Sequence, residues 1–239
     1  MDNAGYIGLT RQAGLMRELN ALANNIANVS TTGYRRENLI FAEHVKALGG
    51  ADADISMATA SRRFIDLAPG EIRTTGNPLD FAIEGEGFFM VETAAGQRLT
   101  RAGAFSVNEI GELVTPEGAR VLDEGGGAII MPARARSISA APDGSIIADG
   151  QPVARLGIAA ADAAFLVREG ANVFRAEKGF EPLENARVRQ FALEGSNVSA
   201  VSEIARLIEV QRTYESGQQL FQGEDDRIRR TVRELGRSQ

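Results

Sequence analysis

Regularly spaced apolar residues at the two ends of the chain constrain its fold more than any other feature of the sequence. Both sets recur at helical intervals, which places a stripe of apolar side chains along one side of each helix. Such a stripe requires a partner surface, so we expect the two helices to pack against each other, against neighbouring subunits, or both. The first stripe comprises Leu9, Met16, Leu19, Ala23 and Ile26, and the second Ile204, Leu207, Tyr214, Phe221, Ile228, Val232 and Leu235.

The two helices have clear expected limits. The first is expected from about Asp2 to about Asn28, with Gly33 in the left-handed conformation that closes a helix. The second is expected to begin after Gly195 and to end near Leu235. Glycines inside both helices each cost up to about 1 kcal/mol relative to alanine, so both helices depend on packing for their order. These glycines are Gly5, Gly8, Gly14, Gly217 and Gly223.

Between the helices the hydrophobic period changes to two. Leu79, Phe81 and Ile83 alternate with polar or small residues, and many short apolar runs are separated by Gly-rich turns, a pattern typical of a small barrel or sandwich. Further strands are expected near Leu99, Phe105–Val107, Leu113–Val114, Val121–Leu122, Ala128–Met131, Ser145–Ala148, Val153–Ala159, Phe165–Val167 and Val173–Phe174.

The predicted fold class is therefore α+β. Long N- and C-terminal α-helices pack together as in a coiled coil, and the central domain is all-β and barrel- or sandwich-like. In the less regular segment before this domain, Glu43–Leu48 is compatible with a helical turn and Ala51–Ser61 with an extended chain. The expected divisions are 1–33 for the N-terminal helix, 34–70 for a linker or extended region, 71–182 for the all-β domain, 183–195 for a return linker and 196–239 for the C-terminal helix.

Charge and composition exclude several classes of function. A net charge of -6 argues against nucleic-acid binding, which requires clustered lysine and arginine. The sequence has no cysteine and a single histidine, so disulfides, thiolate catalysis and Cys-based zinc sites are excluded. It has no apolar run of about 18 residues that would span a membrane, and its N-terminus lacks the pattern of a cleaved secretory signal.

The candidates for catalysis are weak. Asp80, Glu84 and Glu86 form a possible carboxylate cluster, but isolated surface carboxylates are ordinary. His44 lacks a serine or cysteine nucleophile at a recognisable spacing. Gly85-Glu86-Gly87 lacks the third glycine and the following helix of a dinucleotide-binding loop. We therefore predict no enzyme activity, no catalytic residue, no cofactor and no metal site.

The polar segment at the end of the first helix is the most informative motif. Asn24, Asn25 and Asn28 exceed what helix capping alone requires, and amide side chains provide directional hydrogen bonds where helices approach closely. A similar segment, Ser196-Asn197-Val198, precedes the second helix.

Blocks along most of the chain resemble, in the right order, the bacterial flagellar rod and hook proteins. Within that family, the N-terminal sequence and the single β domain of modest size look most like those of the proximal-rod subunits. The blocks are Ala23–Asn28 with Thr32–Tyr34, Thr75–Ile83 with Gly85–Phe89, Thr100–Phe105 with Gly111–Thr115, and Ser196–Val198 with Glu203 and Gln211–Glu215.

The resemblance implies a structural subunit that polymerises helically into the hollow drive shaft joining motor to hook. It further implies partners among copies of itself and other rod proteins, and export by the flagellar type III secretion apparatus to the periplasmic part of the basal body. The residues of this chain that we predict to form subunit interfaces are Leu9, Met16, Leu19, Asn24, Asn25, Ile26, Asn28, Asn197, Val198, Ile204, Leu207, Gln211, Tyr214 and Phe221.

Two alternative functions remain open on the sequence alone. One is a distal-rod or hook-like axial subunit. The other is a β-domain enzyme or carbohydrate-binding protein with helical arms.

Overall fold

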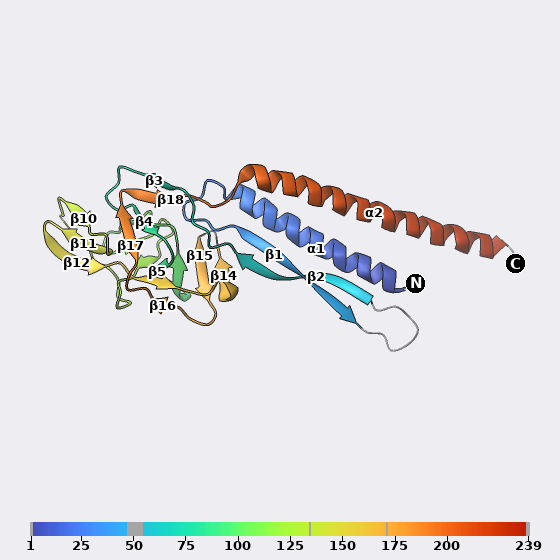
Figure 1. Ribbon diagram of the computed structural model, residues 1–239, viewed down its shortest axis with the longest axis horizontal. Helices are drawn as coiled ribbons and strands as arrows, with labels where there is room; N and C mark the ends of the chain where they lie inside the picture. The colour runs from blue at the N-terminus through green and yellow to red at the C-terminus, as the bar shows by residue number, and fades with distance from the viewer. Residues whose placement is uncertain (1, 47–54, 134, 171, 238–239) are drawn as a thin grey trace. The chain divides into compact units, whose positions relative to one another are not determined.

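The computed structural model describes residues 2–46, 55–133, 135–170 and 172–237 (Figure 1). These residues form two compact units. The helical unit comprises the described parts of Met1–Ile26, Glu37–Arg63 and Ser199–Gln239, and the β-rich unit comprises Ala27–Arg36 and Phe64–Val198.

The helical unit contains both predicted helices, α1 (Asp2–Ala27) and α2 (Ala200–Arg237). It also contains β1 (Glu37–Lys46) and β2 (Ile55–Ile65) except for the last two residues of β2; the two strands pair as a two-stranded sheet. The helical turn expected at Glu43–Leu48 is wrong for its first four residues, which belong to β1, and its last two lie outside the described residues. The extended chain expected at Ala51–Ser61 is confirmed from Ile55 onward, and residues 51–54 lie outside the described ones.

The β-rich unit is built from antiparallel strands. Its largest sheet has the order β14-β15-β6-β5-β9-β8-β7, with β13 joined to β5 and β16 joined to β13. Smaller sheets join β10-β11-β12, β17-β4 and β18-β3. The strands are β3 (Ile72–Thr74), β4 (Phe81–Glu84), β5 (Phe88–Thr93), β6 (Gly96–Thr100), β7 (Ser106–Val107), β8 (Leu113–Val114), β9 (Arg120–Val121), β10 (Ile138–Ala140), β11 (Ser145–Ala148), β12 (Gln151–Arg155), β13 (Ile158–Ala160), β14 (Leu166–Glu169), β15 (Val173–Ala176), β16 (Glu181–Pro182), β17 (Arg187–Gln190) and β18 (Ala192–Glu194), with a 3-10 turn at Ala163–Phe165.

Strand β5 explains why this unit needs two hydrophobic layers. Phe89 and Val91 belong to one apolar cluster, whereas Phe88 and Met90 belong to a second. Because successive side chains of a strand point to opposite faces, β5 is buried on both sides. The uninterrupted apolar run Phe88–Val91 follows from that burial.

The expected barrel is not confirmed. Among the described strands, the largest sheet is an open path whose ends, β14 and β7, do not pair with each other. The strand expected at Ala128–Met131 is also wrong, because this segment makes only the isolated bridges Leu122↔Ala128 and Glu112↔Ile130. Residues 183–195, expected to form a return linker, instead hold β17 and β18, which pair with β4 and β3.

Gly33 has the positive φ that the sequence predicts, +69°, but its expected role in closing the first helix is wrong, because α1 already ends at Ala27. A Cβ at this position would lie 2.3 Å from the backbone nitrogen of Ala102. Glycine is therefore required here both for the left-handed backbone and for close approach to the neighbouring segment.

A carboxylate ties together three adjacent strands of the largest sheet. Glu169 on β14 accepts hydrogen bonds from Arg98 Nε at 2.6 Å and from Arg175 Nε at 2.7 Å. The hydrogen bond from Arg98, followed by the one from Arg175, lowers the pKa of Glu169 below its ordinary value of 4.5. The stabilisation from this carboxylate is therefore complete above pH 4.5 and is lost as the pH falls through the lowered pKa.

We therefore expect Glu169→Gln to lower the urea midpoint of the β-rich unit at neutral pH. The difference from wild type should shrink as the pH falls below 4.5, because the wild-type carboxylate then becomes protonated. Urea unfolding followed by the β-sheet circular dichroism signal over a pH series measures this. Glu181→Gln, an exposed change on β16, is the control, and a difference that persisted unchanged in acid would contradict the expectation.

Candidate assembly interface

One line of α2 faces α1 within the helical unit. Its members are spaced alternately by four and three residues, which is the spacing of a helix-packing seam. All are buried or half-buried, in contrast to most of α2. The line comprises Glu203, Leu207, Val210, Tyr214, Gly217 and Phe221.

Polar contacts fix how the two helices lie against each other. Gln12 Nε2 donates a hydrogen bond to the backbone oxygen of Tyr214 at 3.1 Å. One turn and a half further along, Arg206 Nη2 lies 2.8 Å from Glu18 Oε1. Because Gln12 and Glu18 meet progressively earlier residues of α2, the helices are antiparallel, as Figure 1 shows.

Two helical glycines admit side chains from the opposite helix. A Cβ at Gly8 would lie 2.1 Å from the ring of Phe221, and one at Gly217 would lie 2.1 Å from Gln12 Nε2. Both distances are shorter than real Cβ contacts, so each glycine makes room for the side chain above it. From the sequence alone, these glycines are expected only to lower the stability of the helices. In the structure, they are the positions at which the two helices make contact.

Asn25 joins three elements of the helical unit. Its side chain is fully buried, and its amide exchanges two hydrogen bonds with the backbone of Glu37 on β1, at 2.9 and 3.0 Å. The same Nδ2 donates to Glu203 Oε2 on α2 at 3.0 Å. An amide side chain has both the donors and the acceptor that these bonds require, so Asn25 links α1, β1 and α2.

Asn197 has a comparable role within the β-rich unit. Its Oδ1 accepts a hydrogen bond from the backbone nitrogen of Arg36 at 2.6 Å. Its Nδ2 donates to the backbone oxygens of Asp66 at 3.0 Å and Ala68 at 2.9 Å. The second asparagine motif therefore joins segments 34–36 and 66–68 of the same chain.

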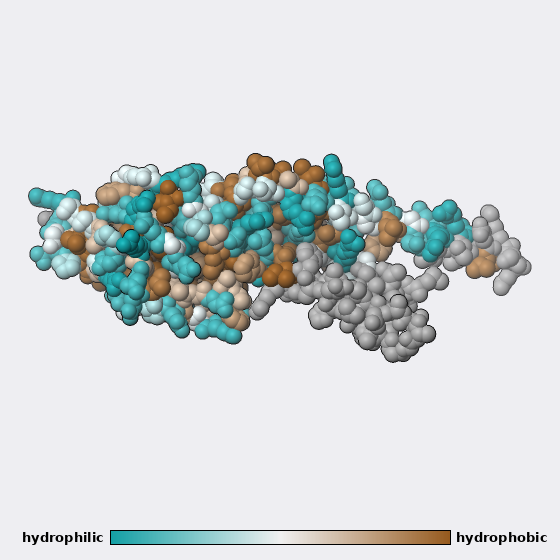
Figure 2. Space-filling view, viewed as in Figure 1, coloured by the Kyte–Doolittle hydropathy of each residue, from teal (hydrophilic) through white to brown (hydrophobic). Residues whose placement is uncertain are grey.

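A second line of apolar side chains on α2 is exposed. Val201 is 81% exposed, and Ile204 and Ile208 are 47% and 45% exposed, so the line continues at helical spacing beside the seam. Figure 2 shows the corresponding hydrophobic surface over the first part of α2. On α1, Leu9 and Met16 are also exposed. Contiguous exposed apolar side chains of this kind mark protein-interaction surfaces.

The predicted interface residues thus fall into three groups. Leu9, Met16, Asn24, Ile204 and Gln211 are exposed; Leu19, Ile26, Asn28, Asn197, Leu207, Tyr214 and Phe221 are half-buried; Asn25 and Val198 are buried. Contact with another subunit stays a prediction for all of them.

Sequence reasoning missed several residues of the helix contact, including Gly8, Gln12, Glu18 and Arg206. One signal in the sequence could have located the contact. Gly217 stands four residues before Phe221 on the same heptad line, and a glycine at such a position indicates a close approach of another helix. The reciprocal contacts with Gln12 carry no signal in a single sequence.

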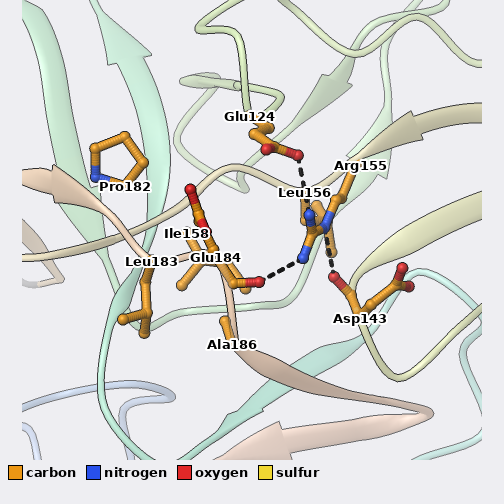
Figure 3. A pocket seen from close by; sticks show the side chains of 9 residues that line it. All are labelled: Glu124, Asp143, Arg155, Leu156, Ile158, Pro182, Leu183, Glu184 and Ala186. Carbon is orange, nitrogen blue, oxygen red and sulfur yellow. Dashed lines mark hydrogen bonds and ion pairs between the residues drawn. The ribbon is translucent and has the colours of Figure 1, made fainter.

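Two of the three carboxylates in the possible cluster have structural partners. Asp80 accepts from Asn77 Nδ2 at 2.8 Å, and Glu84 pairs with Arg189. Figure 3 shows the guanidinium of Arg155 bound to the carboxylate of Glu124 and to backbone oxygens of two further residues, Asp143 and Glu184.

Neither a metal-binding cluster nor a membrane-spanning helix is found among the described residues. Across these residues, no group of three or more histidine, cysteine or acidic side chains is arranged to hold a metal ion. No helix among them combines the length and the apolar character needed to cross a membrane. The side chain of His44, on β1, lies outside the described part of the chain.

Antiparallel terminal helices with an exposed apolar line, joined to a β-rich unit of ion-paired carboxylates, are features of a structural subunit. Three family profiles agree with this class. "Flagella basal body rod protein" matches residues 6–35, "Flagellar hook protein FlgE/F/G D1 domain" residues 82–148, and "Flagellar basal body rod FlgEFG protein C-terminal" residues 189–234.

Curated relatives match the chain over nearly its whole length. Proteins named flagellar basal-body rod protein FlgF are 39% identical in Caulobacter vibrioides, over 99% of both chains, and 36% identical in Mesorhizobium japonicum, over 90% of both. A third, from Rhizobium meliloti, is 34% identical over 100% of both. The chain therefore belongs to the flagellar basal-body rod protein family, and it is a structural rod subunit of the flagellar basal body, not an enzyme.

The glycine contacts predict opposite effects for matched substitutions. Gly8→Ala should destabilise the helical unit by about 1–3 kcal/mol, because the added methyl group displaces the ring of Phe221. Gly223→Ala should stabilise α2 by up to about 1 kcal/mol, since nothing lies within 4 Å of its Cβ position. Thermal melts of the helical circular dichroism signal compare the two, and equal stabilisation by both would refute the contact.

Proposed function

We propose that this chain forms part of the proximal rod, where copies of it and of other rod proteins polymerise helically around a central channel. In this assembly α1 and α2 form a coiled-coil-like pair within the inner tube, and the shaft carries torque from motor to hook. Support comes from the full-length relatives named FlgF and from the heptad spacing of the seam on α2.

The exposed line on α2 is the observation that carries the proposal. Val201, Ile204 and Ile208 already lie beside the intramolecular seam, so α1 does not cover them. Each large apolar side chain contributes about 1.5–3 kcal/mol when it is removed from water. A neighbouring subunit that covers this line gains the share of that free energy that belongs to the still exposed area, about half for Ile204 and Ile208 and most of it for Val201, which provides a driving force for polymerisation.

The route to the rod is a second part of the proposal. A rod subunit in the periplasmic space has to cross the inner membrane, and membership of the flagellar rod family suggests the route. We propose export through the flagellar type III secretion apparatus, which then is a transient partner of this chain. Export assays with and without that apparatus test this step.

The interface is tested by charged substitutions on exposed residues. The double variant Ile204→Asp and Ile208→Asp should abolish swimming and rod assembly, because two carboxylates would be desolvated on contact with a neighbour. Both positions are about half exposed, so the monomer should keep its fold. Soft-agar motility and electron microscopy of isolated basal bodies, in a strain lacking the native copy, are the measurements.

The matched control lies outside the helical unit. Ile110, in the β-rich unit, is 74% exposed, and Ile110→Asp makes the same type of change, with one added charge, at an exposed apolar position. This control should swim normally. Normal swimming of the double α2 variant would exclude this line from the assembly interface.

A further inference from the structure

A groove lies between α1 and α2 in the helical unit. Its volume is about 480 Å³, and its apolar walls include Leu15 of α1 with Leu220 and Phe221 of α2. Leu220 is 70% exposed, so this apolar surface is open to solvent. Because an apolar cavity of about 150 Å³ holds a benzene molecule, the groove has room for about three aliphatic side chains. Its other lining residues are Gly8, Arg11, Gln12, Thr213, Ser216 and Gly217.

The polar lining residues of this groove do not call for a polar occupant. The hydroxyl of Thr213 donates to the backbone oxygen of Glu209 at 2.9 Å, and that of Ser216 donates to the backbone oxygen of Arg212 at 2.8 Å. Arg11 is exposed, and its long side chain can keep the guanidinium in water when the groove is filled. An apolar occupant therefore leaves these groups satisfied.

The exposed line on α2 points away from the groove. Leu220 follows Ile204 by 16 residues, which corresponds to a rotation of about 160° at about 100° per residue. The same interval separates the two positions by about 24 Å along the helix. One copy therefore cannot cover its own line with its own groove, and two different neighbours can use the two surfaces at once.

The line and the groove match in length and in character. The line runs from Val201 to Ile208, about 10 Å at about 1.5 Å per residue, and consists of three branched apolar side chains. The α2 wall of the groove runs from Thr213 to Phe221, which is about 12 Å. Small residues on this wall, including Gly217, allow another helix to approach closely.

We propose that the exposed line on α2 of one copy packs into the α1–α2 groove of the next copy. A contact between two different surfaces of the same chain repeats in one direction and produces an open helical filament, whereas a contact of the line with itself closes into a pair. Parallel neighbours joined in this way are offset by about 20 Å, the distance along α2 from Ile204 to Gly217. The inference rests on the proposed rod function and names what covers the exposed line.

Introduced cysteines test this contact, because the chain has no cysteine of its own. A strain lacking the native copy carries Ile204→Cys together with Leu220→Cys, and its isolated basal bodies are oxidised mildly. Non-reducing gel electrophoresis should show this subunit linked into species of two or more copies. A disulfide requires Cα atoms within about 7 Å, so it cannot form between these positions of one α2. Absence of linked copies in assembled rods would overturn the contact.

Two control variants test which surfaces meet. Ile204→Cys alone should give no dimer, and a dimer would show that the line meets itself, contrary to the proposal. In the second control, Gln222→Cys replaces Leu220→Cys beside Ile204→Cys. Gln222 is exposed but lies about 160° around α2 from Leu220, so this pair should not cross-link. Cross-linking as strong as that of the first pair would remove the groove from the contact.

Filling the groove is an independent test. Ser216 is exposed, so neither Ser216→Trp nor Ser216→Ala should change the helical melt of the monomer. Ser216→Trp should abolish swimming because the indole occupies the groove, whereas Ser216→Ala should swim normally. If Ile204→Asp with Ile208→Asp blocks assembly while Ser216→Trp swims normally, a different surface covers the line. That result would overturn this inference and leave the proposed function standing.

Discussion

The helical unit depends on the buried amide of Asn25. Its two hydrogen bonds with the backbone of Glu37 resemble those between paired strands, and a third bond reaches Glu203 on α2. Because a buried amide left unpaired costs about 1–3 kcal/mol, the three partners are mutually constrained. This interaction sets where α1, β1 and α2 meet, and the seam further along the helices is built from that point outward.

The glycines then decide how closely the helices approach. Phe221 covers Gly8 and Gln12 covers Gly217, so each helix contributes one small and one large residue. A contact of this type restricts the register along the helix axis, because a shift by one turn toward the C-terminus of α1 would place Phe221 against Arg11 or Gln12, which carry a Cβ. These glycines lower the intrinsic helix propensity, but they make the packing of the two helices more specific.

Sequence periodicity located both terminal helices and most strands, because these elements bury one regular face. It failed where burial is irregular: Glu194 is buried on β18, and the strand β17 buries Val188 between charged neighbours. Leu207, Tyr214 and Phe221 do lie on the seam, whereas Ile204, assigned to the same stripe, is exposed beside it. A shift of one residue turns a helix position by about 100°, so spacing alone did not distinguish the two lines. The partners Gln12 and Asn25 depend on long-range contacts.

The helical and β-rich units differ in which side chains they leave exposed, and this difference is consistent with a polymerising subunit. The helical unit satisfies its buried amide internally and leaves apolar residues such as Ile204 exposed. The β-rich unit buries its apolar residues in two clusters and pairs its buried arginines, Arg35 and Arg101, with the buried carboxylate of Glu194. Apolar surface supplies association free energy with little directional preference, whereas a buried charge accepts a partner only in one geometry. In the proposed assembly, the exposed apolar line would therefore supply association free energy without by itself fixing the orientation of the subunits.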